Sequence, residues 1–158
     1  MLKKIPTILY PLMPVLINMG HGDMICLGDS NFPAASTANG TPGGIVRLDG
    51  HGIPEILEAL LDFFPLDIYV EEGDSPVVLM KVVEGDDSVP TDGPRIWQQY
   101  KNIIESSEEA DNFKNFIMVE RTTFYDLAEK CFAVVATGEL ELYANIMLVM
   151  GVVKPPSE

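Results

Sequence analysis

Residues 12–29 read LMPVLINMGHGDMICLGD and pass from a helical pattern to a strand pattern. The first part, 12–19, has apolar residues at helical spacing and ends at a glycine, as many helices do. The apolar run 24–27 then predicts a buried strand, which emerges at Asp29. His21 lies between these two elements with a glycine on either side. The predicted order is therefore helix, glycine turn, strand.

The same alternation extends along the rest of the chain. An amphipathic helix is expected over 53–64, because its apolar residues fall on one helical face. Residues 30–44 are rich in glycine, proline and small polar residues, which predicts a loop. Further strands are expected at 45–48, 77–83, 116–119, 132–136 and 146–149, and further helices at 95–104 and 123–130. Strands that alternate with helices predict a layered α/β domain with a mainly parallel sheet.

Length and composition agree with one domain. A chain of 158 residues suits a single compact unit, and its 47% hydrophobic content supplies a core. We therefore assign residues 1–158 to one domain. Acidic residues cluster around 86–115, and we interpret this region as an acidic insertion.

Charge restricts the class of partner. The chain has 24 acidic and 10 basic residues, a formal net charge of -14. Nucleic acids and anionic membranes bind through basic patches, so we expect neither as a partner. No run approaches the roughly 20 apolar residues of a membrane span, and the start lacks a secretory signal. Cys26 and Cys131 lie in apolar runs typical of buried free thiols. We expect a cytoplasmic protein that acts on a neutral substrate.

The chain has two histidines. The glycines beside His21 leave its ring uncrowded, which suits proton transfer, although a loop histidine can also be incidental. A strand rises about 3.3 Å per residue, so a straight segment would hold His21 far from Asp29. The two would meet only through a folded-back loop or a neighbouring subunit. His51 precedes the helix at 53–64 and is more typical of a surface histidine.

No cofactor motif occurs. A dinucleotide fingerprint needs a strand before its glycines and a third glycine that opens a helix, and the segment around His21 has neither. Phosphate-binding loops and nucleophile elbows are also missing. No spacing typical of metal ligands occurs, although His21, His51 and an aspartate leave a metal site open. Tyr143 and Asn145 could bind a sugar, or could simply begin a strand.

Several segments, taken in order, resemble the RbsD/FucU family over about residues 2–152. The segments are 19–23 (MGHGD), 29–34 (DSNFPA), 47–50 (RLDG), 83–86 (VEGD), 124–125 (FY), 133–139 (AVVATGE) and 143–145 (YAN). The resemblance implies a three-layer α/β/α domain, a sugar mutarotase or pyranase without cofactor or metal, and a ring-shaped homodecamer.

The resemblance also implies roles for individual residues. His21 corresponds to the catalytic histidine, and Asp29 and Arg121 to substrate-binding positions. Three consecutive residues, Tyr143, Ala144 and Asn145, match a substrate-binding segment that completes the site of a neighbouring subunit.

The resemblance favours L-fucose as substrate, with D-ribose second. Arg121, the segment 31–34 and the pair 124–125 are similar to fucose-type members. Ala144 is similar to the ribose type, because fucose-type members usually have glycine there. The stretch 87–115 is longer than the family pattern implies.

Histidine chemistry suits this reaction. In mutarotation the ring oxygen gains a proton and the anomeric hydroxyl loses one, and a side chain with an ordinary pKa of about 6.5 serves both steps. Asp29 and Asn145 would hold hydroxyls, and Arg121 would position a hydroxyl or orient a carboxylate. Two alternatives remain, a sugar-binding accessory protein without catalysis and a metal-dependent hydrolase that uses His21, His51 and Asp29.

Overall fold

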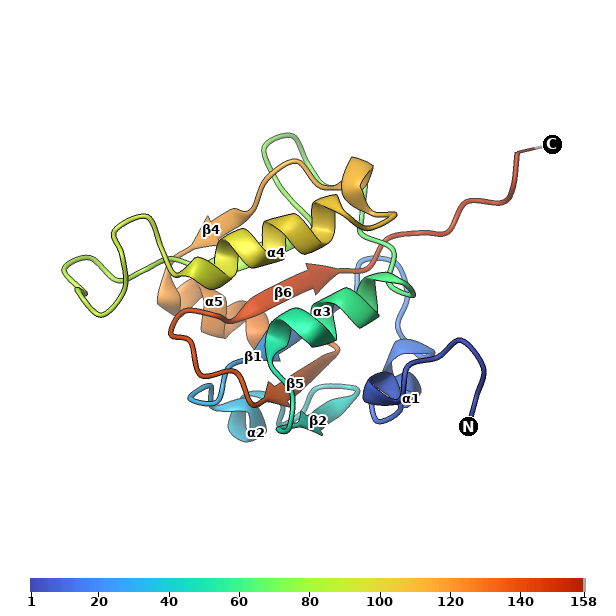
Figure 1. The fold of residues 1–158 in the computed structure, drawn as a ribbon, viewed down its shortest axis with the longest axis horizontal. Coiled ribbons are helices and arrows are strands. Elements are labelled where there is room, and N and C mark those ends of the chain that lie inside the picture. Colours follow the sequence, from blue (N-terminus) through green and yellow to red (C-terminus); the bar gives the residue numbers. More distant parts are fainter. Residues whose placement is uncertain (158) are drawn as a thin grey trace.

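A six-stranded sheet forms the centre of the molecule (Figure 1). The computed structural model describes residues 1–157, so Glu158, the last residue of the expected domain, lies outside the described residues. The strands are β1 (Met24–Gly28), β2 (Gly44–Leu48), β3 (Val77–Met80), β4 (Ile117–Val119), β5 (Ala133–Thr137) and β6 (Ile146–Val149). Their spatial order is β2-β5-β1-β6-β3-β4. Only β6 runs antiparallel to its neighbours, so the sheet is mainly parallel, as expected.

Helices cover both faces of this sheet. They are α1 (Met13–Leu16), α2 (Ala34–Thr37), α3 (Ile53–Leu61), α4 (Arg95–Glu105) and α5 (Arg121–Ala128), with 3-10 turns at Thr7–Leu9 and Ala110–Asn112. In Figure 1, α3 and α4 lie across the near face of the sheet, and α2 and α5 lie behind it. The predicted three-layer α/β/α architecture is therefore confirmed.

Alternate strand residues belong to two separate cores. In β1, Ile25 and Leu27 pack with α3 and α4, whereas Cys26 packs with α2 and α5. Successive side chains of a strand point to opposite faces, and a sheet covered on both faces needs apolar residues at every position. This explains the continuous apolar runs in the sequence. Cys26 and Cys131 are buried free thiols, and burial raises the pKa of Cys131 to about 12.

Some predicted boundaries were wrong for local reasons. The helix expected over 12–19 is a single α-helical turn, α1, and beyond it the amides of Asn18 and Met19 bond to carbonyls three residues back, a tighter turn that ends the helix. The loop expected over 30–44 contains α2, which begins directly after Pro33. The strand expected over 77–83 ends at Met80.

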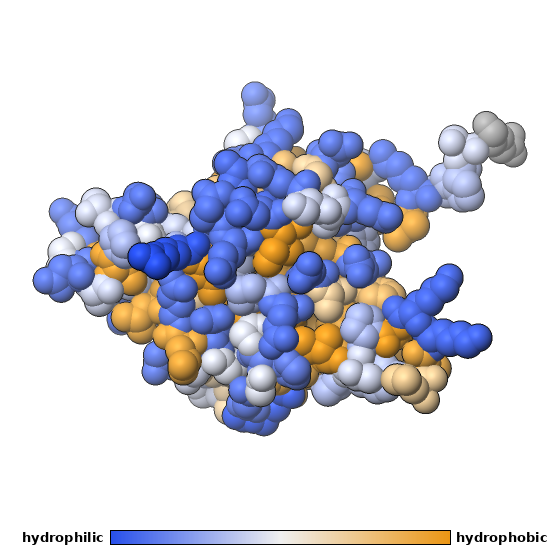
Figure 2. Space-filling model, in the orientation of Figure 1, coloured by the Kyte–Doolittle hydropathy of each residue, from blue (hydrophilic) through white to orange (hydrophobic). Residues whose placement is uncertain are grey.

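The surface is mostly hydrophilic. Figure 2 shows hydrophilic residues over much of the face that α3 and α4 cover, with smaller hydrophobic areas between them, in line with the 24 acidic residues of the sequence. None of the helices within residues 1–157 has the length and apolar character that a membrane span requires.

The strand directions give the sheet two distinct edges. We call the edge where the five parallel strands end, and β6 begins, the carboxyl edge. The opposite edge, where those strands begin and β6 ends, is the amino edge. Open α/β sheets bind ligands at the carboxyl ends of their parallel strands, where the chain order changes direction.

Candidate active site

His21 lies at the amino edge, in the turn between α1 and β1. Gly22 has a φ of +85°, a conformation that glycine adopts without steric cost. The Gly22 amide donates to the Met150 carbonyl at 2.8 Å, which fastens this turn to the chain just after β6. The flanking glycine therefore permits the sharp turn that the sequence predicted.

An aspartate that the sequence analysis missed contacts His21. The His21 Nε2 atom lies 3.1 Å from Asp67 Oδ1. A carboxylate can only accept, so in neutral His21 the hydrogen sits on Nε2 and the Nδ1 lone pair is available as a base. The Asp67 side chain is 9% exposed and that of His21 is 47% exposed. The buried aspartate thus orients a histidine that solvent can reach.

Asp67 is itself held in place. Its Oδ1 also accepts from the Tyr69 amide at 3.0 Å, and its own amide donates to the Val149 carbonyl at 3.1 Å. The Tyr69 ring packs edge-on against His21, with ring centroids 5.5 Å apart. Asp67 lies 46 positions from His21 in the sequence, and only the pairing with the end of β6 brings the two together. No local motif signals that contact.

Asp29 and Asn145 meet at the carboxyl edge. The Asp29 amide donates to Asn145 Oδ1 at 2.8 Å, and Asp29 Oδ1 accepts from the Asn31 amide at 2.9 Å. Burial raises the pKa of the Asp29 carboxyl, and hydrogen bonds from the Asn31 and Phe32 amides oppose that rise. The Asp29 carboxylate borders a hollow of about 370 Å³. Two residues that sequence reasoning named separately therefore form one unit.

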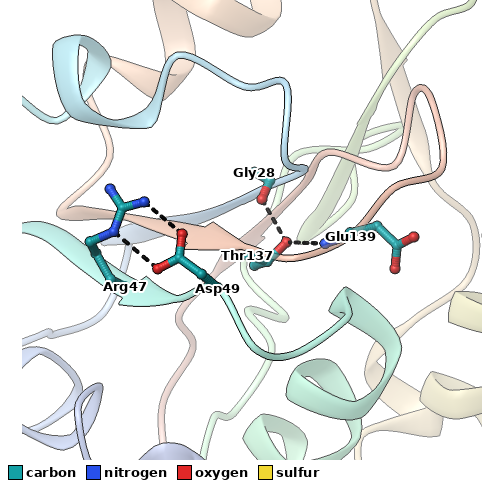
Figure 3. A network of polar contacts seen from close by, with 5 residues as sticks. All are labelled: Gly28, Arg47, Asp49, Thr137 and Glu139. Atoms are coloured by element: carbon teal, nitrogen blue, oxygen red, sulfur yellow. Dashed lines mark hydrogen bonds and ion pairs between the residues drawn. The ribbon is translucent and has the colours of Figure 1, made fainter.

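A polar network ties the strand ends around this hollow (Figure 3). Thr137 Oγ1 donates to the Gly28 carbonyl at 2.8 Å and accepts from the Glu139 amide at 3.2 Å. On the neighbouring strand, Arg47 and Asp49 form a two-pronged ion pair with distances of 2.6 and 3.0 Å. The Thr137 bond ties the end of β5 to the end of β1, and the Arg47–Asp49 pair lies at the end of β2.

Glu139 organises the chain between β5 and β6. Its Oε1 accepts from the amides of Leu140 and Glu141, at 2.9 and 3.0 Å. Its Oε2 accepts from the Ile53 amide at 3.2 Å, at the first turn of α3, where unpaired amides favour a negative charge. The carboxylate thus anchors the segment that leads to Tyr143.

Tyr143 has a left-handed backbone, with a φ of +59°. Its hydroxyl donates to Asp86 Oδ2 and accepts from the Val83 amide at 3.3 Å. Partial burial raises the pKa of the Tyr143 phenol, as does its bond to Asp86, while the charge of Arg121 opposes the rise. The bonds from Ser88 and Tyr143 in turn lower the pKa of Asp86. Sequence reasoning missed Asp86, although it named the segment 83–86 as a family feature.

The five predicted substrate-binding residues share one edge, and the predicted catalytic residue does not. Arg121 begins α5 directly after β4, and Ala144 and Asn145 are buried just before β6. All of these, with Asp29 and Tyr143, belong to the carboxyl edge. His21 lies at the amino edge, and β1 runs unbroken between it and Asp29. Within one chain these halves do not meet.

The second histidine has a local partner. His51 Nδ1 lies 2.9 Å from Glu55 Oε1, one helical turn along α3, as expected for a surface histidine. The Gly138 amide donates to the His51 carbonyl at 2.8 Å, which places His51 near the carboxyl edge, away from His21. Within residues 1–157, no three histidine, cysteine, aspartate or glutamate side chains are grouped to hold a metal ion.

Comparison with known proteins identifies the family. Residues 2–153 match the RbsD / FucU transport protein family. The chain is 46% identical over 151 residues to the fucose mutarotase of Mus musculus, which covers 95% of this chain and 94% of that protein. It is 40% identical over 153 residues to the L-fucose mutarotase of Haemophilus influenzae, covering 96% and 97% of the two chains. The crystal structure of the Streptococcus pneumoniae fucose mutarotase in complex with L-fucose matches with a TM-score of 0.80 at 43% identity, over 97% of this chain and 100% of that one. The chain therefore belongs to the RbsD/FucU family, as the sequence resemblance indicated.

Proposed function

We propose that this protein is an L-fucose mutarotase in which His21 transfers the proton. The observation that carries the assignment is its likeness, over nearly the whole chain, to a fucose mutarotase crystallised with L-fucose. The local geometry supports it. His51 pairs with Glu55 on the adjacent helix, whereas His21 is oriented by the buried carboxylate of Asp67.

The reaction moves one proton off the sugar and one onto it. The anomeric hydroxyl gives up its proton, the bond between the anomeric carbon and the ring oxygen breaks, and the ring oxygen is protonated. The open aldehyde then turns and recloses on its other face. With Nε2 held by Asp67, the Nδ1 atom of His21 is the position that accepts and returns the proton.

The carboxyl edge supplies the groups that hold the sugar. Asp29 and Asn145 present a carboxylate and a carboxamide to sugar hydroxyls, and their mutual hydrogen bond preorganises both. At the same edge, Arg121 lies close enough to Tyr143 for its charge to act on the phenol, and the two can bind a further hydroxyl and an apolar sugar face. Ala144 supports this set through its buried backbone.

A complete site then requires two copies of the chain. The amino edge of one copy would bring His21 to the sugar-binding residues at the carboxyl edge of the next. Such a contact joins two different surfaces, and repeated contacts of this kind form a ring when the rotation between successive copies closes. The decameric ring stays a prediction of the family resemblance, and the cytoplasmic location stays a prediction from the sequence alone.

Substrate choice provides the first test. We expect faster anomer exchange with L-fucose than interconversion of ribose ring forms at equal sugar concentration, because Arg121 fits the fucose type. The measurement is saturation-transfer NMR at the anomeric protons of L-fucose and D-ribose, with and without protein. A clear preference for ribose would reverse the assignment.

Metal independence provides the second test. Proton transfer by His21 needs no metal, so incubation with EDTA should leave L-fucose exchange unchanged within twofold. The same NMR assay, run before and after EDTA treatment and dialysis, measures it. Activity that disappears with EDTA and returns with added zinc would instead support the metal-dependent alternative.

A further inference from the structure

We propose that α4 is a brace for the sugar-binding segment 141–145, with Trp97 and Tyr100 as its positioning residues. The inference rests on the proposed function, because it concerns how the groups that hold the sugar are fixed. It also gives a role to the acidic region 86–115, which contains α4 and which the sequence alone left unexplained.

One side of α4 makes three hydrogen bonds to this segment. Trp97 Nε1 donates to the Tyr143 carbonyl at 2.9 Å, and the Tyr100 hydroxyl donates to the Ala144 carbonyl at 2.6 Å. At the start of the helix, the Ile96 amide donates to Glu141 Oε1 at 3.3 Å. Two consecutive backbone carbonyls are thus held by two side chains that lie nearly one helical turn apart.

The segment needs such support. Tyr143 has a φ of +59°, a region that residues other than glycine rarely adopt and that persists only where surroundings determine it. Two residues further on, the side-chain oxygen of Asn145 accepts a hydrogen bond from the Asp29 amide. Because Trp97 and Tyr100 bind backbone carbonyls, the brace itself uses neither the Tyr143 ring nor the Asn145 carboxamide.

The brace is rigid on its own side. Tyr100 is fully buried, and burial, together with the charges of Glu139, Glu141 and Asp29, raises its pKa far above the ordinary range. The phenol therefore keeps its hydrogen and stays a donor. Trp97 packs on Gly93, where a Cβ atom would lie 2.1 Å from the indole ring. Only glycine leaves room for the ring there.

The chain before α4 contacts the same tyrosine from another side. Asp86 and the Val83 amide bind the Tyr143 hydroxyl, whereas Trp97 binds its carbonyl. Residues 83–100 therefore hold both the backbone and the side chain of Tyr143.

Two substitutions remove the bonds: Tyr100→Phe keeps the aromatic ring, and Trp97→Phe keeps an aromatic side chain but replaces the indole by a smaller phenyl group. The matched control is Tyr10→Phe, which also loses one hydroxyl contact, from the Leu2 amide at 2.7 Å, far from the segment. Each protein is assayed for kcat and KM by L-fucose anomer exchange. Hydrogen–deuterium exchange of peptides that span 141–146 is followed by mass spectrometry on the same samples.

We expect each brace variant to lose about tenfold in kcat/KM, since a misplaced binding group and an unpaired buried carbonyl both weaken the site. Amides within 141–146 should exchange faster in both variants and stay at the wild-type rate in Tyr10→Phe. Kinetics within twofold of wild type, or unchanged amide exchange in this segment, would overturn the brace. Wild-type protein that fails to exchange L-fucose anomers would instead overturn the proposed function, and the amide exchange would still decide the brace.

Discussion

His21→Ala is expected to lower the rate of L-fucose anomer exchange by a factor of about 10²–10⁴, the usual contribution of a positioned general acid or base. Alanine leaves no group at this position that can accept or return a proton. The His21 side chain is 47% exposed, so its loss removes little buried surface and the fold should persist. Saturation-transfer NMR measures the rate, and circular dichroism verifies the fold.

His51→Ala is the matched control for this substitution. It also removes a partly exposed histidine paired with a carboxylate, here Glu55, and should leave the exchange rate within twofold of wild type. The exchange rate of Asp67→Asn should lie between those of His21→Ala and His51→Ala, because His21 is still present but loses the carboxylate that fixes its orientation. A His21→Ala protein with native circular dichroism and wild-type exchange would remove His21 from the mechanism.

Much of the fold could be predicted because its strands are buried on both faces. Strands such as β1 and β5 consist of consecutive apolar residues, and each is followed by glycine or polar residues. Helix ends were predicted less well, because packing and proline positions decide them. The helical turn α2 inside a glycine- and proline-rich stretch had no periodic signal to announce it.

The sequence offered candidate site residues one by one but did not reveal how they are arranged. His21 was noticed for its flanking glycines, and Asn145 through the family resemblance. The contact between Asn145 and Asp29 spans 116 positions in the sequence, and only the antiparallel pairing of β1 with β6 creates it. Asp67 and Trp97 were missed for the same reason, since each acts through a contact with a distant segment.

The central claim is that the two edges of the sheet are two halves of one site. His21 occupies the amino edge, and Asp29 and Asn145 occupy the carboxyl edge, separated by the length of β1. A strand rises about 3.3 Å per residue, so the five residues of β1 span a distance greater than a histidine side chain can reach. If the claim holds, the loss of either half should inactivate a pure assembly.

Asn145→Ala is therefore expected to be nearly inactive, like His21→Ala. The substitution removes the carboxamide that would bind a sugar hydroxyl, and it leaves the Asp29 amide without its partner. The two variants damage different edges of the sheet. A heterologous interface between one copy of each can still join an intact His21 to an intact Asn145.

Co-expression of His21→Ala and Asn145→Ala chains tests this claim most directly. With random pairing in equal amounts, about one interface in four joins two intact halves. Differently tagged chains, purified on both tags in turn, establish that the assemblies are mixed, and saturation-transfer NMR gives L-fucose exchange per subunit. We expect recovery to about a quarter of the wild-type rate. Verified mixing with no recovery above the pure variants would contradict it and would place the whole site within one chain.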